Sequence, residues 1–164
     1  MSERDGMLQR LDAVEGRLAV LSSTPVRADA LTEPDPGSGE RWDAGQVWAH
    51  MAEFVSYWLD QVRAIIAAGI EEPVPFGRTK EDAGRIAAIA RDRTVSVPVL
   101  WSATLTDIES LRSFLEKLDE RAWQVRGLHP SRGVMPLDRI LDEFLVGHLE
   151  QHADQLSSLT LETS

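Results

Sequence analysis

The stretch Gly147-His148-Leu149-Glu150-Gln151-His152 lies near the C-terminal end of this 164-residue sequence, in a segment with helical periodicity. Two histidines four positions apart on a helix lie one above the other on the same face. Their Cβ atoms are then roughly 6 Å apart, so both imidazoles can reach one metal ion. Both fall on an apolar stripe, which predicts that they point into the core. The apolar members of this stripe are Leu137, Ile140, Leu141, Phe144, Leu145, Leu156 and Leu159.

A buried metal ion would need a third protein ligand from another helix, and His50 is the better of the two remaining histidines. It lies on the stripe of a second helix, which Asp43 and Gln46 are predicted to start as a capping box. That stripe consists of Val47, His50, Met51, Phe54, Trp58, Val62, Ile65 and Ile66. By contrast, His129 precedes Pro130 in a turn and is predicted to be an ordinary exposed histidine.

Four amphipathic segments predict an all-α fold, a four-helix bundle forming a single domain over residues 1–164. The first helix is predicted from a cap at Asp5 to Leu21, the second from Asp43 to Gly69, the third from Pro98 to the turn 127–133, and the fourth from Pro136 to about Ser158. A long connection between the second and third helices carries a short helix that Thr79 is predicted to cap. No strand-like alternation is longer than a few residues.

The composition excludes several classes of function. The net charge of −10 and the isoelectric point near 4.8 argue against nucleic-acid binding, which needs a basic surface. The absence of cysteine excludes a protein thiol nucleophile, a disulfide frame and thiolate metal sites. The N-terminus lacks the pattern of a signal peptide, and no apolar run approaches 18 residues, so we expect a soluble, cytoplasmic protein without a membrane partner.

A histidine on an apolar stripe is often a core imidazole that is hydrogen-bonded to its neighbours. Three such histidines are harder to explain in this way, because an unpaired polar group in a core costs about 1–3 kcal/mol. One metal ion shared by His50, His148 and His152 would satisfy all three. Glu53, three residues after His50, is predicted as a catalytic base, with a fourth ligand, an orienting partner or a helix-edge salt bridge as alternatives. Gln155 has the same spacing from His152 and is a candidate for orienting it.

The pair also resembles the His-Glu-x-x-His pattern of zinc proteases, but the glutamate is misplaced. Leu149 follows the first histidine, and Glu150 is turned roughly 200° from His148 on a helix. Glu150 is therefore predicted to be a solvated surface charge. Trp42 and Trp58 are candidates for lining a pocket near His50.

Three motifs together resemble the DinB/YfiT-like superfamily of bacterial metal-binding four-helix bundles. They are Trp42–Glu53 (WDAGQVWAHMAE), the His129-Pro130 turn with Gly133, and Gly147–Leu156 (GHLEQHADQL), so the resemblance spans essentially the whole chain. It implies a metal triad of one histidine from the second helix and a pair from the fourth, which carries over to His50, His148 and His152. It implies no DNA contact.

The same resemblance implies metal-dependent chemistry with low-molecular-weight thiols such as mycothiol or bacillithiol. We therefore expect an S-transferase that uses such a thiol, with zinc or nickel as the divalent metal, a small-molecule substrate and a homodimeric assembly. Isomerase activity is less expected, because the sequence stops soon after its fourth helix, without the added domain of the mycothiol-dependent maleylpyruvate isomerases. Arg78, Arg85, Arg91 and Arg93 are candidates for binding carboxylates of the thiol or the substrate.

Two alternatives remain open at this level. The first is a metal-dependent hydrolase that uses metal-bound water, which titrates near pH 7 in zinc sites. The second is a bundle without enzymatic activity that binds a ligand or a partner. Histidine suits zinc, nickel, copper and iron alike, so the ligand types alone do not select the metal.

Overall fold

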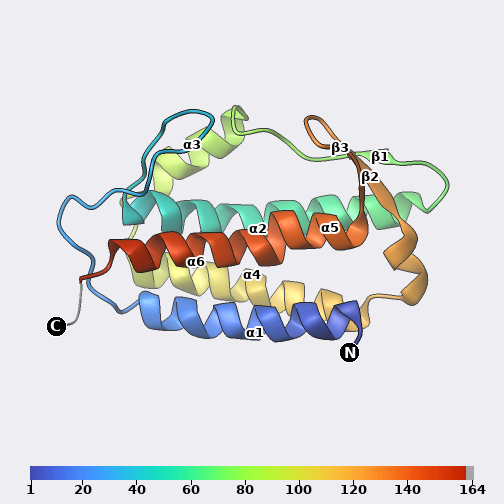
Figure 1. The fold of residues 1–164 in the computed structure, drawn as a ribbon, viewed down its shortest axis with the longest axis horizontal. Coiled ribbons are helices and arrows are strands. Elements are labelled where there is room, and N and C mark those ends of the chain that lie inside the picture. The colour runs from blue at the N-terminus through green and yellow to red at the C-terminus, as the bar shows by residue number, and fades with distance from the viewer. Residues whose placement is uncertain (162–164) are drawn as a thin grey trace.

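The computed structural model describes residues 1–161, and four long helical segments dominate it (Figure 1). These are α1 (Glu3–Leu21), α2 (Ala44–Ala68), α4 (Val97–Lys117) and a C-terminal helix that is continuous from Leu137 to Leu159. The last consists of α5 (Leu137–Leu141), the π-helical segment η2 (Asp142–Val146) and α6 (Gly147–Leu159). The predicted four-helix bundle is confirmed.

The order of the helices around the bundle follows from their contacts. α2 packs against α4 and α6, and α1 packs against the same two helices. In Figure 1, α2 and α4 run in the same direction, while α1 and α6 run in the opposite one. Two neighbouring parallel helices need a connection that crosses the length of the bundle. Residues 69–96 form this connection, as expected, and they include α3 (Ala83–Asp92), which packs on α2.

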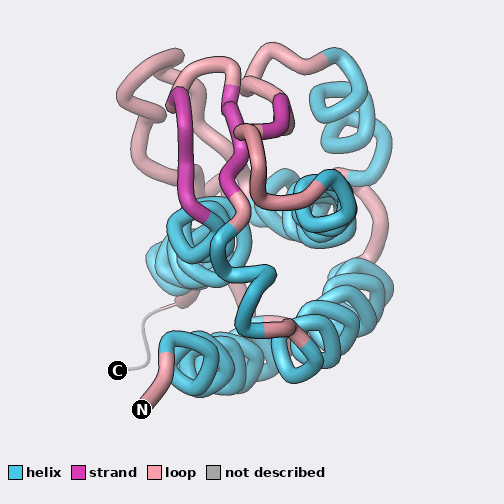
Figure 2. Tube along the Cα trace, turned by 90° about the vertical axis from the view of Figure 1, so that its right-hand side faces the viewer, coloured by secondary structure: helices cyan, strands magenta, loops and turns pink. Residues whose placement is uncertain are grey.

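A small sheet is the main departure from the all-α prediction. Strands β1 (Val74–Pro75), β2 (Arg126–His129) and β3 (Gly133–Pro136) form it, after a short 3₁₀ turn, η1 (Glu120–Gln124). β2 pairs antiparallel with β3 and parallel with β1, so the expected turn 127–133 is instead a hairpin. Figure 2 shows the strands on the same side of the bundle as α3. Such short strands carry little alternation, and the long-range pairing of β1 with β2 has no local sequence signal.

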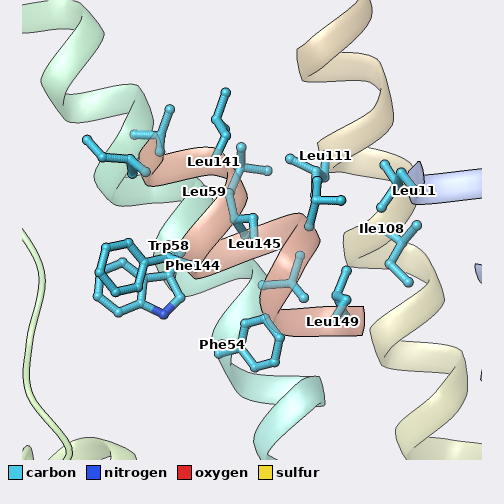
Figure 3. Packing of buried hydrophobic residues seen from close by; sticks show 14 of the residues in the cluster. Leu11, Phe54, Trp58, Leu59, Ile108, Leu111, Leu141, Phe144, Leu145 and Leu149 are labelled. Atoms are coloured by element: carbon cyan, nitrogen blue, oxygen red, sulfur yellow. The ribbon is translucent and has the colours of Figure 1, made fainter. Parts of the chain in front are cut away.

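The core fills the space between the helices with side chains that the stripes predicted. Figure 3 shows Leu11 of α1, Phe54 of α2, Ile108 of α4 and Leu145 of η2 meeting there. Each of these side chains is fully buried. This packing holds α2 and α6 at a fixed separation, which is the condition for a site built from both.

Of the three helix caps predicted from the sequence, one is confirmed and two are wrong. Asp43 and Gln46 form the predicted capping box at the start of α2. α1 begins earlier than predicted, because Ser2 is its cap and Asp5 is the reciprocal partner within the first turn. The cap of α3 is Asp82 and not Thr79, since the Asp82 carboxylate accepts a hydrogen bond from the amide of Arg85.

The π-helical segment ends at Val146, and Gly147 follows it directly before the first histidine of the pair. A Cβ on Gly147 would lie 2.5 Å from the main-chain oxygen of Asp142. Glycine therefore allows the backbone at position 147 to approach this oxygen closely. Arg10 of α1 also pairs with Asp142 and with Glu150. The extra residue of a π turn rotates everything that follows it about the helix axis, and such turns often occur at functional sites.

Among the described residues, no helix is long and apolar enough to cross a membrane.

Candidate metal centre

The structure brings the three predicted histidines together. His50 lies in the second turn of α2, and His148 and His152 lie on successive turns of α6. One nitrogen of each imidazole lies within 4.8 Å of the corresponding nitrogen of the other two. His50 and His152 are buried, whereas His148 keeps partial exposure.

The outer nitrogens of two rings face polar side chains, which leaves their inner nitrogens free. The Nδ1 of His152 lies 2.6 Å from the Gln155 amide oxygen, so this contact is the orienting one predicted. The Nδ1 of His50 lies 3.5 Å from a carboxylate oxygen of Glu53. The hydrogen bond with Gln155 turns the Nε2 of His152 towards the metal position, whereas the contact of His50 with Glu53 is too long or too poorly aligned to be a hydrogen bond.

The inner nitrogens fit a divalent metal ion. The Nε2 atoms of His50 and His148 are 3.4 Å apart. Two nitrogens bound tetrahedrally to zinc at about 2.05 Å would lie roughly 3.3 Å apart. The Nε2 of His152 is buried without a hydrogen-bond partner, and such a buried orphan is expected of a ligand atom. The residues present therefore fit a three-histidine metal site.

All three imidazoles are held neutral, which is the state that binds metal. Burial is the main cause, and it lowers the pKa of His50 and His148 well below the usual value. Burial also lowers the pKa of His152 to about 4, against a smaller opposing effect of the hydrogen bond with Gln155. The neighbouring positive charge of Arg85 lowers the pKa of all three further.

Aromatic rings form the walls around the histidines. Trp42 stacks on His152 with ring centroids 6.4 Å apart, and it meets His50 edge-on at 5.4 Å. Phe54, one turn after His50, stacks on His148 at 4.3 Å. Trp42 thus lies beside the histidines as predicted, whereas Trp58 packs against Phe144 in another cluster.

Glu53 is tied to a residue from the long connection. One carboxylate oxygen forms an ion pair with Arg78, whose side chain is only 9% exposed. Arg78 also lies over the ring of Tyr57, 3.8 Å from its centroid, and 3.8 Å from Asp82. Burial raises the pKa of Glu53, and Arg78 opposes this shift. The expected helix-edge salt bridge is therefore real, but its partner comes from another part of the chain.

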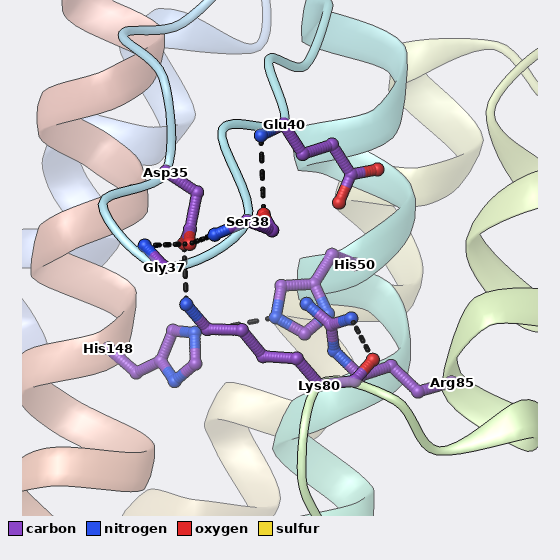
Figure 4. A network of polar contacts seen from close by, with 8 residues as sticks. All are labelled: Asp35, Gly37, Ser38, Glu40, His50, Lys80, Arg85 and His148. Atoms are coloured by element: carbon purple, nitrogen blue, oxygen red, sulfur yellow. Dashed lines mark hydrogen bonds and ion pairs between the residues drawn. The ribbon is translucent and has the colours of Figure 1, made fainter.

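Two segments outside the helices that carry the histidines cover the site. Figure 4 shows the loop with Asp35 meeting Lys80 in front of His50 and His148. The Lys80 ammonium lies 2.5 Å from the Asp35 carboxylate, which also accepts hydrogen bonds from the amides of Gly37 and Ser38. The main-chain oxygen of Lys80 in turn accepts a hydrogen bond from Arg85, 3.0 Å away.

His129 is the clear correction to the sequence analysis. It is 5% exposed, and its ring stacks on Phe144 at 5.0 Å. Its Nδ1 accepts hydrogen bonds from the amides of Ser131 and Arg132, which hold the β2–β3 turn. Gly77 passes so close that a Cβ there would lie 2.8 Å from the imidazole. The hairpin buries this histidine, and a turn assignment could not reveal that.

The remaining candidates lie away from the three histidines. Glu150 faces away from them as predicted, but it pairs with Arg10 of α1 and is not simply solvated. Arg91 pairs with its neighbour Asp92, and Arg93 pairs with Asp43. A surface groove of about 670 Å³ between α2, α4 and η1 is not lined by any of the three histidines.

Comparison with known proteins identifies the fold through solved structures alone. No family model and no curated protein matches this sequence. YfiT from Bacillus subtilis, described as a probable metal-dependent hydrolase with an unusual four-helix bundle topology, superposes with a TM-score of 0.70 at 19% identity. The match covers 97% of this chain and 87% of that protein. This chain has the DinB/YfiT-like fold.

A second structure of this fold is that of a mutant of the mycothiol-dependent maleylpyruvate isomerase. It superposes with a TM-score of 0.70 at 16% identity and covers 98% of this chain. The chain spans 62% of the length of that isomerase. At these identities the two likenesses define the DinB/YfiT-like fold, which agrees with the resemblance seen in the sequence motifs.

Proposed function

We propose that this protein is a divalent-metal-dependent enzyme acting on a small molecule, with His50, His148 and His152 as the metal ligands. The observation that carries the proposal is the convergence of three neutral imidazoles, together with the buried inner nitrogen of His152, which has no hydrogen-bond partner. Both of the solved structures compared above come from proteins described as enzymes, one of them a probable metal-dependent hydrolase. Three protein ligands leave a position for a further ligand, as in catalytic zinc sites.

We also propose that the fourth ligand of the metal, beside the three histidines, is a low-molecular-weight thiol and that the reaction is S-transfer. A divalent ion bound here would supply Lewis acidity and deprotonate a thiol that binds to it. A thiol activated in this way needs no protein base. This matters because Glu53, the acidic side chain beside the histidines, is already engaged by Arg78. The mycothiol dependence of the isomerase with this fold supports a thiol cosubstrate.

Hydrolysis is the second candidate, favoured by the description of YfiT. It would place water where the S-transferase places the thiol, and the histidines would have the same role. The two candidates differ in what they require, since hydrolysis of an ester or amide proceeds without any added thiol.

For Glu53 we propose a positioning role in place of the predicted role as a base. Its carboxylate lies between the Nδ1 of His50 and the guanidinium of Arg78. The 3.5 Å contact is not a hydrogen bond in this structure, and we propose that metal binding closes it, since a carboxylate that accepts from Nδ1 fixes the tautomer and the orientation of a ligating imidazole. Arg78 holds this carboxylate from the other side, so the acceptor for the Nδ1 of His50 is already in place.

The first experiment is the metal content of protein purified without a metal-affinity tag, measured by mass spectrometry. We expect about one equivalent of a divalent metal in the native chain and none in His50→Ala or His148→Ala, with helicity retained by circular dichroism. His129→Ala is the matched control, because it removes a buried imidazole from another cluster and should keep the metal. Unchanged metal content in the two ligand variants would refute the site.

A second experiment separates the two chemistries. The metal-loaded protein is incubated with electrophiles such as an alkyl halide or an epoxide in the presence of a small thiol, and with activated esters and amides in its absence. Thioether formation that depends on His148 supports the S-transferase. Ester or amide turnover without thiol, lost in the same variant, would replace it with the hydrolase.

A further inference from the structure

Arg85 differs from the other arginines near the histidines because it forms no close ion pair with a carboxylate among residues 1–161. The only side-chain hydrogen bond that it makes among residues 1–161 is to the main-chain oxygen of Lys80, and no carboxylate there lies within 4 Å. Burial is the main cause of a lowered pKa for its guanidinium, and the charge of Arg78 adds to it, while the more distant carboxylates of Glu53, Glu40 and Asp35 oppose it in part. Where the pKa of Arg10, Arg91 or Arg112 is shifted, it is raised by carboxylate partners.

The neighbouring cations are engaged in contacts within the protein. Arg78 pairs with Glu53 and approaches Asp82, and Lys80 pairs with Asp35. Their charges are therefore already balanced, and their positions serve the local structure. Arg85 is half-buried beside them with most of its donors unused.

Arg85 is also close to the metal ligands. Its guanidinium carbon lies 5.5 Å from the ring centroid of Trp42, which itself contacts His50 and His152. Figure 4 places Arg85 beside His50, on the side of the site that Lys80 and Asp35 cover.

The charge balance at this position calls for an anion. Three neutral imidazoles leave the charge of a divalent ion uncompensated, and Arg85 adds another positive charge nearby. An unpaired, half-buried guanidinium is a site of strong carboxylate or phosphate recognition, because its hydrogen bonds are charge-assisted and bidentate.

We propose that Arg85 is the substrate-recognition residue of this site and that it binds a carboxylate of the substrate or of the thiol. The inference rests on the proposed metal-dependent function and names the class of compound that the site selects. A carboxylate carries one negative charge and matches the single unpaired guanidinium. A phosphate dianion would call for a second free cation, and Lys80 and Arg78 are both engaged.

The test uses pairs of simple thiols bound to the zinc-loaded protein. Mercaptocarboxylates with two, three and five methylene groups are each compared with the mercaptoalcohol of the same length, by titration calorimetry. The alcohol measures binding of the thiol alone, and the ratio of the two affinities measures the carboxylate. Succinate and inorganic phosphate are titrated separately into the metal-free and the zinc-loaded protein.

We expect at least one mercaptocarboxylate to bind roughly tenfold or more tightly than its alcohol, the gain of a charge-assisted bidentate contact. Arg85→Gln should abolish this advantage while leaving the affinity for the alcohol unchanged, and Arg85→Lys should restore part of it. Arg91→Gln, on the same helix but paired with Asp92, should retain all of it.

The outcomes distinguish a failure of the proposed metal-dependent function from a failure of the proposed role of Arg85. Failure of zinc and of the neutral thiols to bind would refute the proposed function, and succinate binding to the metal-free protein would then decide whether Arg85 binds carboxylates. If thiols bind but no carboxylate has an advantage, or if the advantage survives in Arg85→Gln, the role of Arg85 is refuted. Tighter binding of phosphate than of succinate would overturn the carboxylate assignment.

Discussion

At the residue scale, each histidine of the site is prepared by a different neighbour. Gln155 holds the ring of His152 from behind, and Glu53 faces the ring of His50. Phe54 stacks on His148 and limits its rotation. Rings that are already oriented lose less conformational freedom when they bind metal, so these neighbours should contribute to metal affinity.

The contribution of Glu53 can be tested by Glu53→Gln. We expect metal affinity to fall by roughly 10–100-fold, the usual effect of removing a carboxylate that supports a ligating histidine. Zinc affinity is measured by competition with a chromophoric chelator. Glu116→Gln, at an exposed position of α4, should leave the affinity unchanged. Equal affinities in the two variants would remove Glu53 from the site.

The histidines also predict how the stability of the metal-free protein depends on pH. The pKa of His152 is about 4 in the folded protein and near 6.5 when unfolded, so the unfolded chain binds the proton more strongly. The free energy of unfolding therefore falls as the pH drops from 6.5 towards 4. His152 alone should account for a loss of about 2 kcal/mol at pH 5, and His50 and His148 act in the same direction.

Urea unfolding of the metal-free protein at pH 7 and pH 5 measures this loss. Carboxylates with ordinary pKa values are mostly ionised at pH 5, and the raised pKa of Glu53 acts in the opposite direction, so a variant of His152 is needed to isolate the histidine contribution. His152→Phe should show a smaller loss than the native chain. The interpretation would be wrong if the two proteins lost stability equally.

At the scale of the elements, the C-terminal helix carries the most specific local feature. The π-helical segment η2 precedes the histidine pair and determines the direction in which α6 presents it. Arg10 of α1 pairs with Asp142 and Glu150, on either side of Gly147 along the chain, and so ties this helix to its neighbour. The rotation of α6 is therefore determined both by its own backbone and by α1.

Gly147→Ala tests the role of this segment. Its Cβ would lie 2.5 Å from the main-chain oxygen of Asp142, so the π turn must shift. We expect a destabilisation of about 1–3 kcal/mol, as for other overpacked sites, together with weaker zinc binding because His148 moves. Gly16→Ala in α1 is the control. Nothing lies within 4 Å of its Cβ, so it should be neutral or stabilising by up to about 1 kcal/mol.

Denaturant unfolding and zinc titration of both variants check these expectations. If Gly147→Ala were as stable as the native chain and bound zinc equally well, the π turn would have no part in positioning His148.

At the scale of the whole molecule, the site joins two helices that are far apart in the sequence. His50 belongs to α2, and the other two histidines belong to α6, 98 residues further on in the case of His148. A metal ion bound by all three would cross-link these helices in the folded state only. Binding should therefore stabilise the entire bundle and not just one helix.

Thermal unfolding with and without zinc measures this effect. At a free zinc concentration 1,000 times the dissociation constant, binding stabilises by about 4 kcal/mol, which raises Tm by roughly 8–16 °C for a domain of this size. A chelator should reverse the rise, and His148→Ala should show none. The same Tm with zinc and with chelator in the native chain would argue for histidines that bind no metal.

Helical periodicity, a local property of the sequence, determined the four main helices and the inward direction of His50, His148 and His152. The capping box at Asp43 was predictable for the same reason, because both partners lie within one turn. The orienting contact of Gln155 followed from its three-residue spacing from His152. Neighbours on the same helix face need no knowledge of the rest of the fold.

Only the tertiary structure decided the contacts that join distant segments. The pairing of Arg78 with Glu53, the cover formed by Asp35 and Lys80, and the unpaired state of Arg85 all depend on how residues 69–96 cross the bundle. The burial of His129 likewise depends on a hairpin that pairs with β1, more than 50 residues earlier. Such contacts are set by packing between elements, and no local pattern of side chains encodes them, so they became visible only in the folded chain.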